Sequence, residues 1–118
     1  MSEPLILAVP LFSELGNLGL ALRREVFIHE QHVPPEEEFD AYDLTATHVV
    51  ALDGGNVVGA LRIVFLDEHV KFGRVVVSAP ARGKGIASRM MRFAMDCASS
   101  RGETRFYLTA QTDKLGFY

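Results

Sequence analysis

A short loop that contains two glycines and two basic side chains is the part of this sequence best suited to chemistry. Residues 82–87 read Arg-Gly-Lys-Gly-Ile-Ala, and they follow a β-branched run at residues 75–77. Gly83 and Gly85 leave backbone N–H groups accessible, and a helix that begins there directs the positive end of its dipole at a ligand. The pattern predicts a site for a phosphate-containing ligand. The same residues also suit an ordinary strand-to-helix turn that binds nothing.

Two common nucleotide-binding patterns are absent from the sequence. It contains neither the P-loop pattern G-x-x-x-x-G-K-[S/T] nor the dinucleotide pattern G-x-G-x-x-G. The loop fits R/Q-x-x-G-x-G/A instead, with Arg82, Gly85 and Ala87 at the fixed positions. This favours a phosphate-containing cofactor of another kind.

An acidic segment precedes this loop in the chain. Five carboxylates lie in the eight residues from Glu36 to Asp43, directly after Pro34 and Pro35. The composition of residues 34–43 predicts an irregular loop. One interpretation is a solvated acidic loop, and the other is a pocket wall that attracts a cationic amine.

The elements that position these residues begin with a strand and a helix. Residues 5–9 are apolar and predict a first strand. Residues 12–32 predict a helix, with apolar side chains three or four positions apart. Gly16 and Gly19 each weaken the first turns by about 1 kcal/mol relative to Ala, so we expect the secure part of the helix at 18–30.

The rest of the chain predicts an antiparallel meander and then a β-α-β crossover. Strands are expected at 48–52, 57–66, 70–77 and 105–109, and a helix at 85–100. A right-handed crossover would place the last strand parallel to the one before it. The expected fold class is therefore α/β, with a mixed sheet of the α+β type.

Composition narrows the class of protein. The 118 residues are 48% hydrophobic and 23% charged, with a net charge of −3, which predicts one globular domain over residues 1–118. The charge argues against nucleic acid as a partner, and the longest apolar run is too short for a membrane span. Cys97 is the only cysteine, and we expect its thiol to lie in the core. We expect no metal site. A single cysteine also suits a cytoplasmic location.

Residues 75–88 resemble the acetyl-CoA-binding motif of the GNAT superfamily of N-acetyltransferases. The expected order of elements matches that family along essentially the whole chain. Residues 24–31, with Val33-Pro34 and Asp40, resemble a branch of small, mostly uncharacterised bacterial members. The pairs Ala110-Gln111 and Phe117-Tyr118 resemble the same branch.

The resemblance implies a role for individual residues. The strand before the loop would offer backbone groups to pantetheine from Val75, Val76 and Val77. The pyrophosphate would be wrapped by Arg82, Gly83, Lys84, Gly85, Ile86 and Ala87, with Ser88 beside it. Gln111 stands where the family usually has an Asn that contacts the pantetheine arm. Tyr118 stands where a tyrosine can protonate the departing CoA thiolate, although it also suits packing in a final helix.

The implied reaction is acetyl transfer from acetyl-CoA to a primary amine, through a tetrahedral intermediate. The acceptor would be a small-molecule or peptide amine. A non-catalytic CoA-binding or regulatory module, or a fragment that binds nothing, would share the same sequence features. The sequence does not decide which residue is the general base. The candidates are Glu30, Glu37, Glu38, Asp40, Asp43 and His48. His48 stands at the start of an expected strand, where an ordinary structural histidine is the alternative.

Family members continue beyond the tyrosine with two more antiparallel strands, whereas this sequence ends at Tyr118. We therefore expect a domain that lacks its final strands and leaves the fifth strand as an exposed edge. An exposed edge invites pairing with another chain. The expectation is a homodimer that covers the edge, or a poorly stable fragment.

Overall fold

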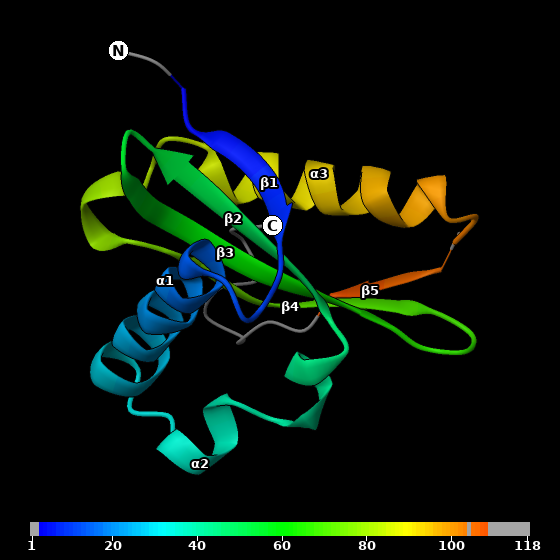
Figure 1. Ribbon diagram of the computed structural model, residues 1–118, viewed down its shortest axis with the longest axis horizontal. Helices are drawn as coiled ribbons and strands as arrows, with labels where there is room; N and C mark the ends of the chain where they lie inside the picture. The colour runs from blue at the N-terminus through cyan, green and yellow to red at the C-terminus, as the bar shows by residue number, and fades with distance from the viewer. Residues whose placement is uncertain (1–2, 104, 109–118) are drawn as a thin grey trace.

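The fold is built on one five-stranded mixed sheet (Figure 1). The computed structural model describes residues 3–103 and 105–108. The strands lie in space in their sequence order, as β1 Leu5–Val9, β2 Thr47–Asp53, β3 Asn56–Phe65, β4 Val70–Val77 and β5 Phe106–Leu108. Neighbours from β1 to β4 are antiparallel, and β5 is parallel to β4. The predicted meander and the parallel fifth strand are confirmed, and Thr109 lies outside the described residues.

Helices cover both faces of this sheet (Figure 1). On one face lies α1 Glu14–Arg23, which continues into the π-helical segment η1 Arg24–Glu30. On the other lies α3 Ile86–Ser100, close to the predicted bounds. No helix in the described part of the chain is long and apolar enough to cross a membrane.

The start of α1 differs from the prediction of weak first turns. Ser13 caps the helix, because its side chain accepts a hydrogen bond of 3.1 Å from the Gly16 N–H. A Cβ on Gly16 would lie 2.2 Å from the Pro10 carbonyl oxygen, so glycine allows the two backbones to approach. The glycine therefore fits the helix start tightly, and α1 begins at Glu14, close to the predicted start at residue 12, with ordered first turns.

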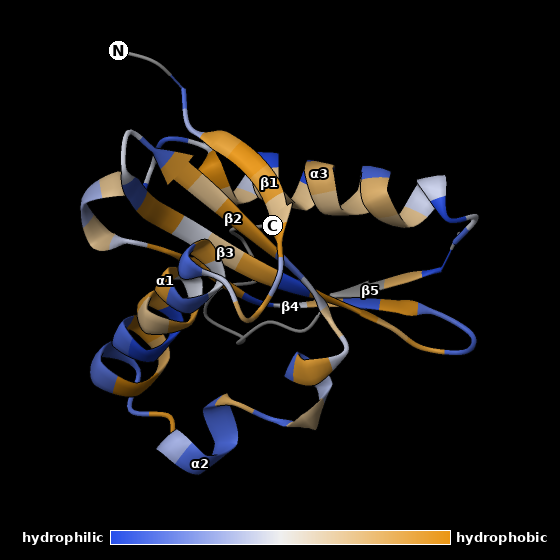
Figure 2. Ribbon diagram, viewed as in Figure 1, coloured by the Kyte–Doolittle hydropathy of each residue, from blue (hydrophilic) through white to orange (hydrophobic). Residues whose placement is uncertain are grey.

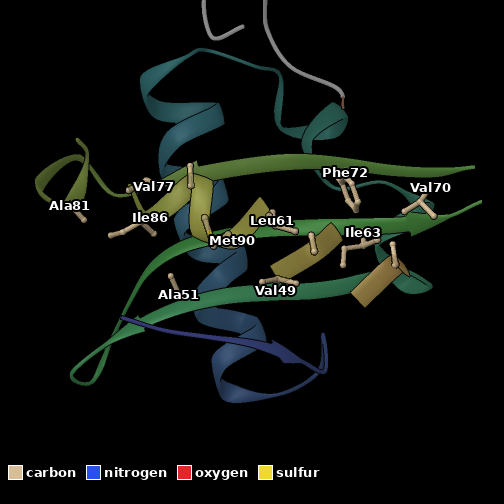
Figure 3. Packing of buried hydrophobic residues seen from close by; sticks show 13 residues of the cluster. Val49, Ala51, Leu61, Ile63, Val70, Phe72, Val77, Ala81, Ile86 and Met90 are labelled. Carbon is tan, nitrogen blue, oxygen red and sulfur yellow. The ribbon is translucent and has the colours of Figure 1, made fainter. Parts of the chain in front are cut away.

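Side chains along the strands alternate between two apolar layers. The α3 layer includes Val49, Leu61 and Phe72 from the strands, which pack with Met90 of α3 (Figure 3). The α1 layer consists of Leu22, Val26, Val50, Ala60 and Val76. Figure 2 shows hydrophobic colours along the strands and hydrophilic ones at the turns between them. Both layers pack against the sheet from which the loop after β4 emerges.

The acidic segment is not an irregular loop, so that prediction is wrong. It forms a short helix, α2 Pro35–Glu38, and a 3-10 turn, η2 Ala41–Leu44. Asp40 caps η2, and the Asp43 side chain accepts a hydrogen bond of 2.9 Å from the Asp40 N–H. These two turns fix the direction of the acidic side chains.

A bulge interrupts β4 just before its last residues. Ala60 pairs with Val76 while Arg62 pairs with Gly73, so two residues of β4 oppose Leu61 alone. The first of the two, Arg74, has a left-handed φ of 54°. A similar irregularity adjoins Gly59 in β3.

Candidate functional site

The predicted phosphate loop joins β4 to α3. The 3-10 turn η3 Ala79–Ala81 leads the chain out of the sheet, and Gly83 and Gly85 then have left-handed φ values of 81° and 78°. Within the described residues, a Cβ on either glycine would meet no atom within 4 Å. No described side chain caps α3, whose N-cap is Gly85. The first N–H groups of α3 can therefore bind an anion.

The side chains of this loop differ in exposure. Lys84 and Ser88 are exposed, whereas Ile86 and Ala87 belong to the α3 layer of the core. Ile86 and Ala87 can thus offer a ligand only their backbone N–H groups. Lys84 is the loop side chain that extends freely into solvent.

Arg82, predicted to add charge at the loop, has two partners. Its Nε donates to the Val77 carbonyl oxygen at 2.8 Å, and its Nη2 donates to Glu30 Oε2 at 2.6 Å. Glu30 ends η1, so this ion pair connects that helix with the loop. The positive charge of Arg82 is therefore partly offset by Glu30.

Residues 75–77 of β4 lie beyond the part of the strand that β5 covers. β5 pairs with Val70, Lys71 and Phe72. On the other side of β4, Val76 and Val77 pair with β3. Among the described residues no strand covers the β5-facing edge of 75–77, so backbone groups there can meet a ligand.

Arg23 is at the centre of a buried ion network. It is 2% exposed, and its Nε donates to Glu38 Oε2 at 2.8 Å while its Nη1 donates to Asp43 Oδ1 at 2.7 Å. Asp43 has no exposed surface. Burial alone would raise the pKa of Asp43, but hydrogen bonds from Arg23 and from the Asp40 N–H lower it to about 2.

Two more arginines extend this network toward the surface. Arg62 binds Asp40 through two hydrogen bonds of 2.6 and 3.0 Å, and it lies 3.1 Å from Asp43 Oδ2. Arg74 donates to the Glu38 carbonyl oxygen at 3.0 Å and to Asp40 Oδ2 at 3.3 Å. The hydrogen bond from Arg62 lowers the pKa of Asp40.

These contacts change both interpretations of the acidic segment. Glu38, Asp40 and Asp43 are paired with arginines, and Glu38 and Asp43 are buried, whereas the Asp40 side chain is 35% exposed. Asp40 lines a cavity, in line with a pocket wall, but its carboxylate is already bound by Arg62. Within the segment, Glu36 and Glu37 keep exposed side chains.

His48 lies at the start of its strand, as expected, but it is buried. It is 7% exposed, and its Nε2 lies 2.8 Å from the Asp43 carbonyl oxygen. Its strand, β2, has β1 on one side and β3 on the other. His48 is therefore a hydrogen-bonded core residue.

The sequence reasoning missed the three arginines of this network. Arg62 carried the clearest signal, because it interrupts the longest apolar run of the chain, and a charge inside a buried strand needs a partner. Arg23 and Arg74 gave no comparable signal, since their partners lie 15 to 37 residues away.

A cavity of about 220 Å³ opens where this network reaches β4. Asp40 and Tyr42 line it from the acidic segment, Arg62 lines it from β3, and Lys71 and Arg74 line it from β4. The structure thus brings Asp40 together with β4, close to residues 75–77. Of the other predicted site residues, Gln111 and Tyr118 lie outside the described residues.

Comparisons with known proteins agree with this geometry. Residues 19–118 match the family described as Acetyltransferase (GNAT) family. The Bacillus subtilis (strain 168) protein YjcF, described as an uncharacterized N-acetyltransferase, is 37% identical over 97 residues, which cover 82% of this chain and 69% of that protein.

Solved structures give the same result at the level of the fold. Escherichia coli ElaA superposes with a TM-score of 0.83 at 30% identity, over 100% of this chain and 84% of that one. An acyl-CoA N-acyltransferase from Pseudomonas aeruginosa superposes with a TM-score of 0.82 at 31% identity, over 98% of this chain and 83% of that one. The chain is therefore an acyltransferase that belongs to the GNAT family of acetyltransferases.

Proposed function

We propose that this chain transfers an acetyl group from acetyl-CoA to a primary amine. The observation that carries the proposal is the open loop at the start of α3, with Gly83 and Gly85 in left-handed conformations. The pyrophosphate would bind the N–H groups of residues 83–88, with Lys84 beside it. Pantetheine would lie along the uncovered edge of residues 75–77, as in the family resemblance. Gln111 would contact its arm.

The reaction needs direct attack by a neutral amine. The amine nitrogen bonds to the thioester carbonyl carbon, and the carbonyl electrons move to oxygen, where a backbone N–H of β4 would stabilise the charge. Collapse of this tetrahedral intermediate breaks the C–S bond and expels the thiolate. Tyr118 would give that thiolate its proton, because a phenol has a pKa of about 10.

The amine must first lose its proton, and the buried carboxylates are poor bases for this step. A carboxylate whose pKa is about 2, such as Asp43, holds a proton too weakly to remove one from an amine efficiently. Asp40 is disfavoured for the same reason, and Glu30 is engaged with Arg82. Glu38 is engaged with Arg23, and His48 Nε2 lies 2.8 Å from the Asp43 carbonyl oxygen. Glu37, which is exposed, and a water molecule are the remaining candidates.

Calorimetric titration with acetyl-CoA tests the loop directly. We expect Gly85→Glu to weaken binding at least tenfold, because the new side chain adds bulk and negative charge at the pyrophosphate. Gly54→Glu is the matched control, since Gly54 also has a left-handed φ of 64° and open space around it, but lies in the β2–β3 turn. Equal affinity of the two variants would contradict the loop assignment.

A second variant separates an enzyme from a module that only binds CoA. Tyr118→Phe should keep the acetyl-CoA affinity and lower kcat about 100-fold, which is the contribution typical of a general acid. Unchanged turnover would remove Tyr118 from the mechanism. Absence of turnover by the parent protein, with binding retained, would favour the non-catalytic module.

We further propose that the chain works as a homodimer in the cytoplasm on a small-molecule or peptide amine. Cys97 is a free thiol, which suits a reducing compartment. In the described part of the chain β5 has a strand on one side only, which supports pairing at that edge. Sedimentation velocity measures this association directly.

A further inference from the structure

Among the described residues, Lys71 is the charged side chain lining the cavity beside β4 that has no ion-pair partner. Arg62, which also lines the cavity, is paired with Asp40 and Asp43. Arg74 lies 3.3 Å from Asp40 Oδ2 and 3.6 Å from Glu38 Oε2. The cavity therefore carries one positive charge without a carboxylate partner, that of Lys71.

Arg74 presents unused hydrogen-bond donors to this space. Its Nε and Nη2 bind the carbonyl oxygens of Glu38 and Glu37, and Nη2 also reaches Asp40. Among the described residues nothing accepts a hydrogen bond from its Nη1. Burial, together with the charges of Arg62 and Arg23, lowers the pKa of Arg74, and the carboxylates of Asp40 and Glu38 oppose this shift.

Lys71 adds a second donor on the same strand. It is exposed, and it pairs with no carboxylate in the part of the chain that the structure describes. Because Lys71 and Arg74 line one cavity, a single anionic group between them could contact both. Arginine binds planar carboxylates and phosphates in a fork, while lysine binds them as a point charge.

We propose that the acceptor is a primary amine that also bears a carboxylate or a phosphate, and that Lys71 and Arg74 bind this anionic group. The inference rests on the proposed acetyl transfer and names the substrate class for the same site. The volume of about 220 Å³ is below the range typical of drug-sized ligands and fits a molecule of amino-acid size. The acceptor is thus small and anionic instead of polycationic.

The position of the pair on β4 suits the reaction. Arg74 directly precedes residues 75–77, along which pantetheine is proposed to lie, and Lys71 lies on the same strand. An anion held at Arg74 would therefore present its amine to the thioester.

Matched amines test the substrate class. With acetyl-CoA, we expect kcat/KM for 4-aminobutanoate and O-phosphoethanolamine to exceed that for butylamine and 1,4-diaminobutane by at least tenfold. The preferred anion distinguishes carboxylate from phosphate recognition. Equal or higher kcat/KM for the neutral or dicationic amines overturns the proposal. Absence of acetyl-CoA binding in the same protein would instead contradict the proposed function.

Charge-removing variants test the binding residues. Lys71→Gln should raise KM for the anionic amine about tenfold, with kcat/KM for butylamine and the acetyl-CoA affinity unchanged. Arg92→Gln is the matched control, because it removes one exposed charge on α3 and should change neither value. If both variants behave alike, Lys71 does not bind the anion.

A binding measurement that needs no turnover completes the test. In ¹H–¹⁵N spectra, titration with O-phosphoethanolamine or 4-aminobutanoate should shift the Nε–Hε signal of Arg74, and butylamine at equal ionic strength should not. The shift should require at least tenfold more ligand in Lys71→Gln. An Arg74 signal that responds to none of the anions, or equally to butylamine, overturns the proposal.

Discussion

At the scale of single residues, Asp43 shows how the fold depends on a charge that water does not reach. Its pKa is lowered from the ordinary value of 3.8 to about 2, despite burial, by hydrogen bonds from Arg23 and the Asp40 N–H. Between these two pH values the unfolded chain binds a proton at this position and the folded chain does not. The stabilisation is therefore complete above about pH 4 and is lost as the pH falls through about 2.

Urea unfolding at several pH values measures this linkage. We expect the free energy of unfolding to drop by about 2 kcal/mol between pH 4 and pH 2 because of Asp43. Asp43→Asn should be less stable by about 3 kcal/mol at pH 7, since it leaves Arg23 partly unpaired. Its free energy of unfolding should fall less than that of the parent protein when the pH is lowered. An identical acid response in both proteins would exclude Asp43 as the cause.

Glu30 allows a second prediction at this scale. Its ion pair with Arg82 is partly exposed, so Glu30→Gln should change the free energy of unfolding by less than about 1 kcal/mol. Acetyl-CoA should bind up to about fivefold more tightly, because the charge of Arg82 is no longer offset. The exposed Glu25 lies on the same π-helical segment, so Glu25→Gln is the matched control for calorimetry. Weaker binding by Glu30→Gln would show that the pair positions the loop.

At the scale of elements, the first turn of α1 has no space for a side chain at Gly16. Gly16→Ala would place a Cβ 2.2 Å from the Pro10 carbonyl oxygen, and the backbone cannot move away cheaply. We expect the free energy of unfolding to fall by about 1 to 3 kcal/mol. Gly55→Ala has no atom within 4 Å of its new Cβ and should change stability by less than about 0.5 kcal/mol. Thermal melts of both proteins check this, and equal melting temperatures would contradict the contact.

Elements with a clear pattern of apolar residues could be predicted from the sequence. Continuous apolar runs located β2 to β4, because helices cover both faces of the sheet. Three-to-four spacing located α3, because one face of that helix is buried. The π-helical turn at Arg24–Glu30 was missed, since apolar spacing does not distinguish it from an α-helix. The need for glycine at position 16 was missed because the contact is with a backbone atom before the helix.

At the scale of the whole molecule, the loop of the candidate site could be predicted and its charged cavity could not. Glycine and basic residues at fixed spacing identify a local turn, and that turn is where the sequence placed it. The arginine network depends on the packing of α1, the acidic segment and two strands together. Its members therefore become neighbours only in the folded chain.

The order of the strands predicts which backbone amides exchange with deuterium first. β2 and β3 are flanked by strands on both sides, so their amides should exchange with deuterium only through global unfolding. Amides of β5, at the edge of the described sheet, should exchange earlier, and added acetyl-CoA should protect residues 78–88 most strongly. Exchange followed by mass spectrometry checks both points. Early exchange in β3 would contradict this order of opening.

The bulge in β4 has a consequence for how substrate preference can change during evolution. One left-handed residue, Arg74, both offsets the strand just before the presumed cofactor edge and aims a guanidinium at the cavity. A mutation there would alter two properties at once, and the carbonyl groups of Glu37 and Glu38 would lose their donor. Within the described residues, Lys71 has no second structural role of this kind. Drift toward new acceptors, or a laboratory selection for them, should therefore proceed through position 71 while position 74 stays constant.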